Sequence, residues 1–372
     1  MNKHRVIVVG GGLAGLAAAM KIAELGMSVL LVSFLPVKRS HSVCAQGGIN
    51  GAVNIKGEGD SPDIHFYDTV KGGDFLANQP LCKDMCHHAP YIINLMDRLG
   101  VNFNRTPEGN LDFRRFGGTL YHRTAFAGAT TGQQLLYALD EQVRHFEVQG
   151  IIEKMELHEY LGAVLNSDGR CIGAVINNLR NGEITTIKGD AVILATGGPG
   201  LVYGRSTNSM VCTGTAATSA YLQGAKYGNG EFIQIHPSAI PGRDKLRLMS
   251  ESARGEGGRI WVPRKAGDSR KPKDIPEKER FYFLEERYPL YGNLVPRDVG
   301  AREIYDICVN EGLGVKGEMK VYLDLTHHTH EFLDRRLGGI LETYEKFTGV
   351  DPRVEPMEIF PAVHYSMGGI WT

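Results

Sequence analysis

Residues 5–15 read Arg-Val-Ile-Val-Val-Gly-Gly-Gly-Leu-Ala-Gly, and this stretch decides the fold. The apolar run at 5–9 predicts a buried parallel strand, and a helical run at 16–25 follows the glycines. Residues 28–32 then predict a second strand. A strand, a glycine turn, a helix and a strand in this order predict an α/β, Rossmann-like domain with a parallel sheet.

The glycines of this turn are typical of a site for a dinucleotide. Gly10 makes the tight turn, Gly12 lets a pyrophosphate approach the backbone, and Gly15 allows close packing of the helix on the strand. The helix N-terminus at Leu13 and Ala14 then faces the phosphates. Ser33 stands where an acidic residue usually binds the ribose, so the sequence does not predict how the adenosine end is held.

Length and composition limit the class of protein. The chain has 372 residues, which favours two domains, and a net charge of -1, which gives no indication of nucleic-acid binding. The six cysteines form no disulfide pattern, which favours a reducing compartment. Cys82, Cys86, His87 and His88 predict a helix with buried thiols rather than a metal site. The sequence has no signal peptide and no window of about 18 apolar residues, so we expect contact with a membrane only through partners.

A second informative stretch, 38–51, reads Lys-Arg-Ser-His-Ser-Val-Cys-Ala-Gln-Gly-Gly-Ile-Asn-Gly. Hydroxyl residues flank its one histidine, His41, and two glycines follow. Small residues here would let the backbone approach something flat and bulky, so we predict that a flavin ring lies against this stretch. The basic and aromatic turn at 113–118 is open to two interpretations, a surface turn or one wall of an anion pocket.

The remaining chain predicts a first domain at 1–240, a smaller α+β capping domain at 241–350, and a strand at 351–372 that returns to the first domain. We expect residues 51–79 to be rich in loops, 191–194 to be a buried strand and 264–280 to be an exposed insertion. Further helices are predicted at 82–99, 134–145 and 332–347, with a strand at 321–325 and an antiparallel meander at 161–164, 171–176 and 183–188.

Five separated motifs resemble the flavoprotein subunit of succinate dehydrogenase and fumarate reductase. They are the glycines of 10–15, the stretch 40–48, His236-Pro237, the segment 251–258 and the segment 364–369. The amino-acid sequence around 38–60 and 113–133 is similar to that of the subgroup whose membrane anchor is a diheme cytochrome b subunit. The resemblance runs from the first strand to the last residue and implies only the N-terminal portion of the family fold, without its C-terminal part.

The resemblance implies FAD, bonded covalently through His41. Imidazole is a competent nucleophile, which agrees with this role. The other cofactor-binding positions that we expect are Gly10, Gly12, Leu13, Ala14, Gly15, Ser33, Ser40, Ser42, Ala45, Gln46, Gly47, Gly48, Asp74, Ala195, Thr196, Gly197, Asn208 and Thr213.

The resemblance also implies a dicarboxylate substrate, succinate or fumarate, which needs clustered donors and cations. Arg297 matches the arginine that takes the proton while hydride leaves for FAD, and Glu251 and Arg254 match its proton relay. The substrate-binding positions implied are His236, Ser250, Glu251, His364, Gly47 and Phe116. The family commonly has threonine at Ser250, and the hydroxyl is retained.

The implied partners are an iron-sulfur subunit, which passes electrons to quinone, and indirectly the cytochrome b anchor. The implied location is the cytoplasmic face of the cell membrane. Because the family continues past the last residue of this chain, we expect these 372 residues alone to bind FAD weakly and to turn over little succinate. Fumarate reduction, L-aspartate oxidation and a non-enzymatic assembly module remain alternatives, and His41 argues against the oxidase.

Overall fold

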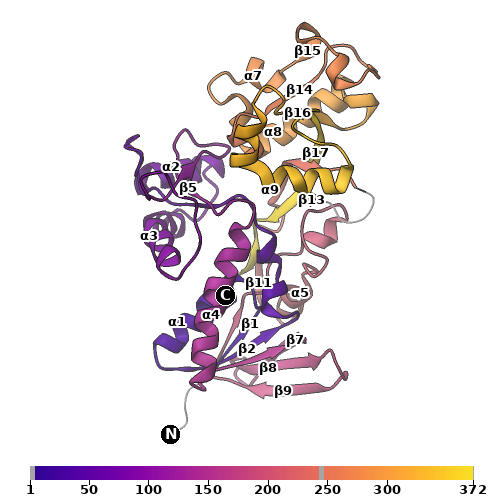
Figure 1. Cartoon of the computed structure of the whole chain (residues 1–372). Coiled ribbons are helices and arrows are strands. Elements are labelled where there is room, and N and C mark those ends of the chain that lie inside the picture. Colours follow the sequence, from indigo (N-terminus) through magenta and orange to yellow (C-terminus); the bar gives the residue numbers. More distant parts are fainter. Residues whose placement is uncertain (1–4, 243–246, 372) are drawn as a thin grey trace.

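A four-stranded parallel sheet forms the base of the molecule in the computed structural model, which describes residues 5–242 and 247–371 (Figure 1). Its order is β10-β1-β2-β6, and the predicted Rossmann-like start is confirmed. The strands are β1 (Arg5–Val9), β2 (Ser28–Ser33), β6 (Ile152–Glu156) and β10 (Ala191–Leu194).

Each face of this sheet is covered by a different layer. Helices α1 (Leu13–Glu24) and α4 (Thr131–Val148) bury one face, with Leu31 and Leu136 fully buried between them. The predicted meander covers the other face, where Tyr160 and Ile176 pack on Leu30. The meander consists of β7 (His158–Leu165), β8 (Cys171–Asn178) and β9 (Ile184–Lys188). The apolar runs of β1 and β2 follow from burial on both faces.

A helical lobe stands beside the sheet and contains one helix that the sequence analysis missed. Residues 51–79 include α2 (Pro62–Gly72), which starts with a Ser61 cap whose hydroxyl accepts the Ile64 N–H at 3.2 Å. Helix α3 (Gln79–Arg98) follows as predicted. A small sheet links this lobe to the cavity described below, with strands β3 (Ile49–Asn50), β4 (Phe113–Arg114) and β5 (Thr124–Ala125).

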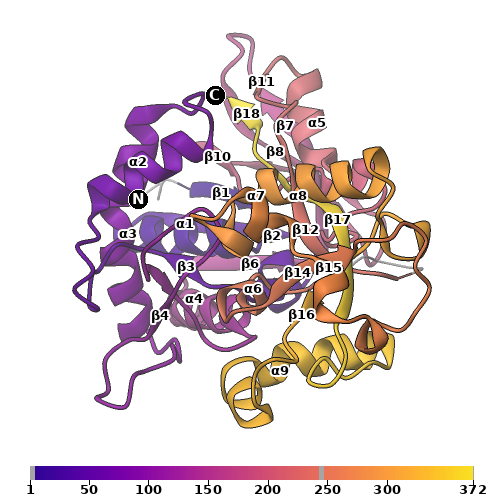
Figure 2. The same ribbon diagram turned by 90° about the horizontal axis from the view of Figure 1, so that it is seen from above.

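The upper part of the molecule is built on a six-stranded sheet that reaches down to the base (Figures 1 and 2). Its two longest strands, β12 (Ile233–Ile240) and β17 (Met357–Ser366), pair antiparallel. The other strands are β13 (Arg247–Leu248), β14 (Arg259–Pro263), β15 (Arg280–Phe281) and β16 (Val321–Asp324). The helices are α6 (Ser252–Gly255), α7 (Phe283–Arg287), α8 (Arg297–Tyr305) and α9 (His330–Thr348). Helix α5 (Thr215–Leu222) and the pair β11 (Lys226–Gly228) and β18 (Gly369–Trp371) lie nearer the base.

One expectation about burial is wrong, and another holds only in part. Strand β10 was expected to be buried, but it lies at the edge of its sheet and Ile193 is 37% exposed. The segment 264–280 is not wholly exposed, because Pro272 and Ile275 are buried and Ile275 packs in a cluster with Trp261. Among the described residues, no helix is long and apolar enough to cross a membrane, and no cluster of side chains suits a metal ion.

Candidate functional site

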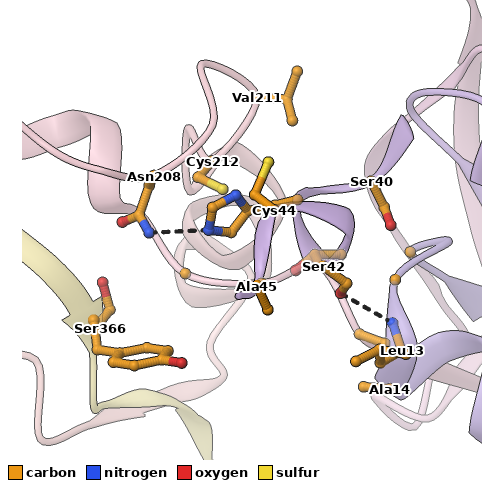
Figure 3. A pocket seen from close by; sticks show the side chains of 18 of the residues that line it. Leu13, Ala14, Ser40, Ser42, Cys44, Ala45, Asn208, Val211, Cys212 and Ser366 are labelled. Atoms are coloured by element: carbon orange, nitrogen blue, oxygen red, sulfur yellow. Dashed lines mark hydrogen bonds between the residues drawn. The ribbon is translucent and has the colours of Figure 1, made fainter. Parts of the chain in front are cut away.

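The glycine turn between β1 and α1 has the geometry that a close ligand requires. Gly10 has φ +118°, and a Cβ at this position would lie 2.1 Å from the Ala195 carbonyl oxygen. A Cβ at Gly15 would lie 1.8 Å from the Gly10 carbonyl oxygen, so Gly15 packs the helix on the strand. The Leu13 N–H at the start of α1 donates to the Ser42 hydroxyl at 3.2 Å (Figure 3). The N-terminus of α1, which has no acidic residue in its first turn, is therefore suited to an anion.

A cavity of about 1140 Å³ opens in front of this turn. Figure 3 shows Leu13 and Ala14 on one side of it and Asn208 and Ser366 on the other. The predicted cofactor residues that line it are Gly10, Gly12, Leu13, Ala14, Ser33, Ser40, His41, Ser42, Ala45, Gln46, Gly47, Gly48, Ala195, Thr196, Gly197, Asn208 and Thr213. Gly15 lies behind the turn, and the exposed Asp74 follows α2 and does not line the cavity. Ser33 also uses its hydroxyl locally, because it donates to the Leu35 carbonyl at 2.5 Å.

The strip of backbone at Gln46 and Gly47 is fixed from behind by Arg114, which the sequence analysis left unassigned. Arg114 is 2% exposed, and its Nε donates to the Gly47 carbonyl at 3.1 Å. Its guanidinium lies 4.0 Å from the centre of the Phe126 ring, and burial lowers its pKa to about 10. A Cβ at Gly47 would lie 2.6 Å from the Phe116 ring, so only glycine fits between the strip and this ring. The turn at 113–118 is thus a wall of the cavity rather than a surface turn.

His41 lies in the cavity wall with a polar neighbour close to each ring nitrogen. The Asn208 side-chain amide is 3.2 Å from Nε2, and the Ser209 N–H is 3.3 Å from Nδ1. Asn208 is oriented in turn by the His364 carbonyl, which accepts from its Nδ2 at 2.9 Å. The ring that is expected to carry FAD is therefore held in a defined plane beside the cavity.

Two histidines from the paired strands β12 and β17 form the far end of the cavity. The rings of His236 and His364 lie 5.0 Å apart, edge to face. Burial is the main cause that holds the pKa of His236 well below its usual range, with Arg297 adding to it. Burial and Arg297 lower the pKa of His364 to about 3. Both rings are therefore neutral near pH 7.

The proton position on His236 follows from its partners. The backbone N–H of Ser238 can only donate, and it lies 3.2 Å from Nδ1, so Nδ1 is the acceptor. The single ring proton is therefore on Nε2. Within the described residues that nitrogen is buried without a hydrogen-bond partner, although the residue lines the cavity. His236 thus offers an unused N–H donor to a ligand.

A carboxylate between two arginines lies beside these histidines. Glu251 is 3% exposed, its Oε2 accepts from Arg297 at 2.6 and 2.8 Å, and its Oε1 accepts from Arg254 at 2.7 Å. Burial alone would raise the pKa of Glu251, but the two arginines and the Gly117 N–H lower it. Burial lowers the pKa of Arg254, which Glu251 opposes. The three residues predicted as a relay, Glu251, Arg254 and Arg297, therefore lie in hydrogen-bond contact. Ser250 and Arg297 line the cavity, and Arg254 is buried behind Glu251.

The residues present fit a large ligand with polar groups. Besides His236, the buried Ser40 hydroxyl, Gln46 Oε1 and Ser366 hydroxyl line the cavity and have no partner in the described structure. FAD would place its phosphates at the glycine turn, where the close backbone approach and the start of α1 suit them.

The comparisons with known proteins agree with this geometry. The chain is 67% identical to the succinate dehydrogenase flavoprotein subunit of Bacillus subtilis over 371 residues, which cover 100% of this chain and 61% of that relative. It superposes on a chain of an E. coli quinol fumarate reductase variant with a TM-score of 0.87 at 33% identity, covering 99% of this chain and 61% of that one. A second quinol–fumarate reductase structure gives a TM-score of 0.86 at 33% identity, with 100% and 63% covered.

The chain thus spans about three fifths of the length of the relatives that it matches. The family model described as an FAD binding domain matches residues 5–372, and the chain belongs to this family of FAD-binding domains.

Proposed function

We propose that this chain binds FAD and a dicarboxylate together and serves the interconversion of succinate and fumarate. The observation that carries the proposal is the cavity itself, which the glycine turn lines at one end and His236, Arg297 and His364 line at the other. Two neutral imidazoles and a cation suit two carboxylates, and they lie within one cavity with the expected flavin stretch. The relatives named as succinate dehydrogenase and fumarate reductase support the same substrate class.

In this proposal each residue has a separate task. His236, Ser250 and His364 bind and orient a substrate carboxylate, and Phe116 and Gly47 form the wall next to it. Bound FAD supplies the hydride acceptor. Arg297 gives a proton to Glu251, whose Oε2 is 2.6 Å from Arg297 Nη2, and the resulting neutral guanidine takes the proton from the neighbouring carbon. Arg254 is the next member of this relay, 2.7 Å from Glu251 Oε1.

Dicarboxylate selectivity tests this function. The chain loaded with FAD is titrated with succinate, fumarate and butyrate while the flavin absorbance is followed. We expect saturable changes with both dicarboxylates and a much weaker response to butyrate, which has one carboxylate. Equal affinity for butyrate and succinate would refute the proposal.

We also propose that FAD is bonded to His41. The support is its place in the cavity wall, between Asn208 and Ser209. After acid precipitation the flavin fluorescence should remain on the denatured polypeptide and be released from the His41→Ser variant. Release from the unsubstituted chain would contradict the bond and favour the L-aspartate oxidase alternative or a non-enzymatic module.

The expected partners and domain limits remain proposals as well. We propose an iron-sulfur subunit, a cytochrome b anchor and a place at the cytoplasmic face of the membrane. The support is that the Bacillus subtilis relative is named as one subunit of succinate dehydrogenase. The division at 240 and 350 stays a proposal, because one sheet crosses both limits: strand β17 pairs with β16 in the upper part and with β12.

A further inference from the structure

One short segment, residues 206–209, contacts two of the three histidines used in the proposed function, His41 and His364. Asn208 and Ser209 contact the His41 ring, as described above. Thr207, which the sequence analysis did not single out, is 7% exposed and places its hydroxyl 2.6 Å from His364 Nδ1. The segment is anchored to β17, because the Thr207 N–H donates to the Val363 carbonyl at 3.0 Å.

The direction of the bond between Thr207 and His364 follows from the acceptors nearby. The hydroxyl has one proton and two acceptors within reach, Nδ1 at 2.6 Å and the Val363 carbonyl at 3.4 Å. That carbonyl already accepts the Thr207 N–H at 3.0 Å. The contact to Nδ1 is the shorter of the two, so the hydroxyl proton goes to this nitrogen.

We propose that Thr207 is a positioning residue that fixes the tautomer of His364, so that its Nε2–H is presented to a substrate carboxylate. This inference rests on the proposed function for its ligand, but not for its geometry. His236 is held in the same tautomer by the Ser238 N–H. The two neutral rings, 5.0 Å apart, then each present an Nε2–H donor. Ser238 on β12 orients His236 through Nδ1, and Thr207 in the segment 206–209 orients His364 through Nδ1.

The tautomer is read directly from the ring nitrogens. The full chain is labelled with ¹⁵N-histidine, long-range ¹H–¹⁵N correlations are recorded, and His364 is assigned with the His364→Asn variant. We expect protonation on Nε2 and an unprotonated Nδ1 that accepts a hydrogen bond. In Thr207→Val the Nδ1 resonance should move to the position of a nitrogen without a donor, and Thr207→Ser should restore it. Protonation on Nδ1 in the unsubstituted chain, or an unchanged Nδ1 in Thr207→Val, overturns the proposal.

Succinate affinity gives a second readout. Loss of one hydrogen bond that orients a ligand donor should weaken succinate binding to Thr207→Val about tenfold. Thr207→Ser should bind like the parent, as should the matched control Thr69→Val on α2, whose hydroxyl donates to the His65 carbonyl at 2.8 Å. Unchanged affinity in Thr207→Val contradicts the inference. If the unsubstituted chain does not bind succinate, the proposed function fails, while the ring spectrum still decides the role of Thr207.

Discussion

Breaking the charge cluster at Glu251 should strongly destabilise the chain without FAD, because it leaves buried arginines without their carboxylate. The carboxylate accepts from Arg297 through Nε and Nη2, from Arg254 through Nη2, and from the Gly117 N–H at 3.0 Å. In Glu251→Gln one oxygen becomes an NH₂ group, which faces an arginine donor instead of accepting from it. Breaking one side of a buried ion pair costs about 3–5 kcal/mol. Arg254 keeps its hydrogen bond to the Asn293 carbonyl at 2.9 Å, and the Arg297 side chain is 22% exposed. We therefore expect Glu251→Gln to lower the free energy of unfolding by about 3 kcal/mol.

Urea unfolding at pH 7 without added FAD measures this loss. A matched control is Glu342→Gln on α9, where the carboxylate is 58% exposed and 3.8 Å from Lys346, so that a change of less than about 0.5 kcal/mol is expected. A double-mutant cycle with Arg254→Met should show strong coupling, because the two variants break the same contact. A loss below about 1 kcal/mol, or simple additivity with Arg254→Met, would show that the cluster is not coupled as the distances indicate.

The pH dependence of the unfolding free energy is a second test of the Glu251 carboxylate. The pKa of Glu251 is lowered in the folded chain, so the unfolded state binds its proton first. The stabilisation is complete above the ordinary pKa of 4.5 and is lost as the pH falls through the folded value. The difference in unfolding free energy between the parent and Glu251→Gln should therefore shrink as the pH is lowered below 4.5. A difference that grows towards acid would contradict this sign.

Three further predictions concern other parts of the chain. Gly10→Ala should lose FAD binding and unfold at lower temperature. The control is Gly72→Ala, where a Cβ would meet nothing within 4 Å, so that it should be neutral or stabilise the chain by up to about 1 kcal/mol. Equal shifts of the melting temperature in the two variants would contradict this. Burial lowers the pKa of His65 to about 4. Between pH 6.5 and 4 this residue should therefore make the free energy of unfolding fall with falling pH, by up to about 1.4 kcal/mol per pH unit. His65→Gln should flatten the slope of unfolding free energy against pH. Arg114→Met should weaken succinate and FAD binding in titrations far more than Arg115→Met, because the Arg115 side chain is 43% exposed and 3.6 Å from a surface carboxylate.

The elements that the sequence predicted are those with a strong local pattern. The run at 5–9, the glycine turn and the meander carry their signals within a few residues, and all three are confirmed. Helix α2 also had a local signal that was overlooked, namely the cap Ser61 followed by Pro62 at the first helical position. The exposure of β10 could not be read from its apolar residues, because burial depends on what packs outside the strand.

The site was predicted through its motifs, but its supporting residues were not. Arg114 and Thr207 act through contacts with residues 67 and 157 positions away in the chain, and neither has a local pattern that predicts those partners. Arg114 was visible only as part of a basic and aromatic turn. Thr207 lies among other small polar residues, and only the fold shows that its hydroxyl meets a histidine.

The meeting of His236 and His364 depends on one irregularity that periodicity does not predict. Gln234 pairs with Tyr365, but the next residue, Ile235, pairs with Val363, so His364 is an extra residue in β17. Side chains alternate along a strand, and His236 pairs with Ala362. Without the extra residue His236 would pair with Val363, and His364 would point to the opposite face of the sheet. The β-bulge places His364, two residues from Ala362, on the same face as His236. The far end of the cavity is thus set by the register of the strand pair as much as by the histidines themselves.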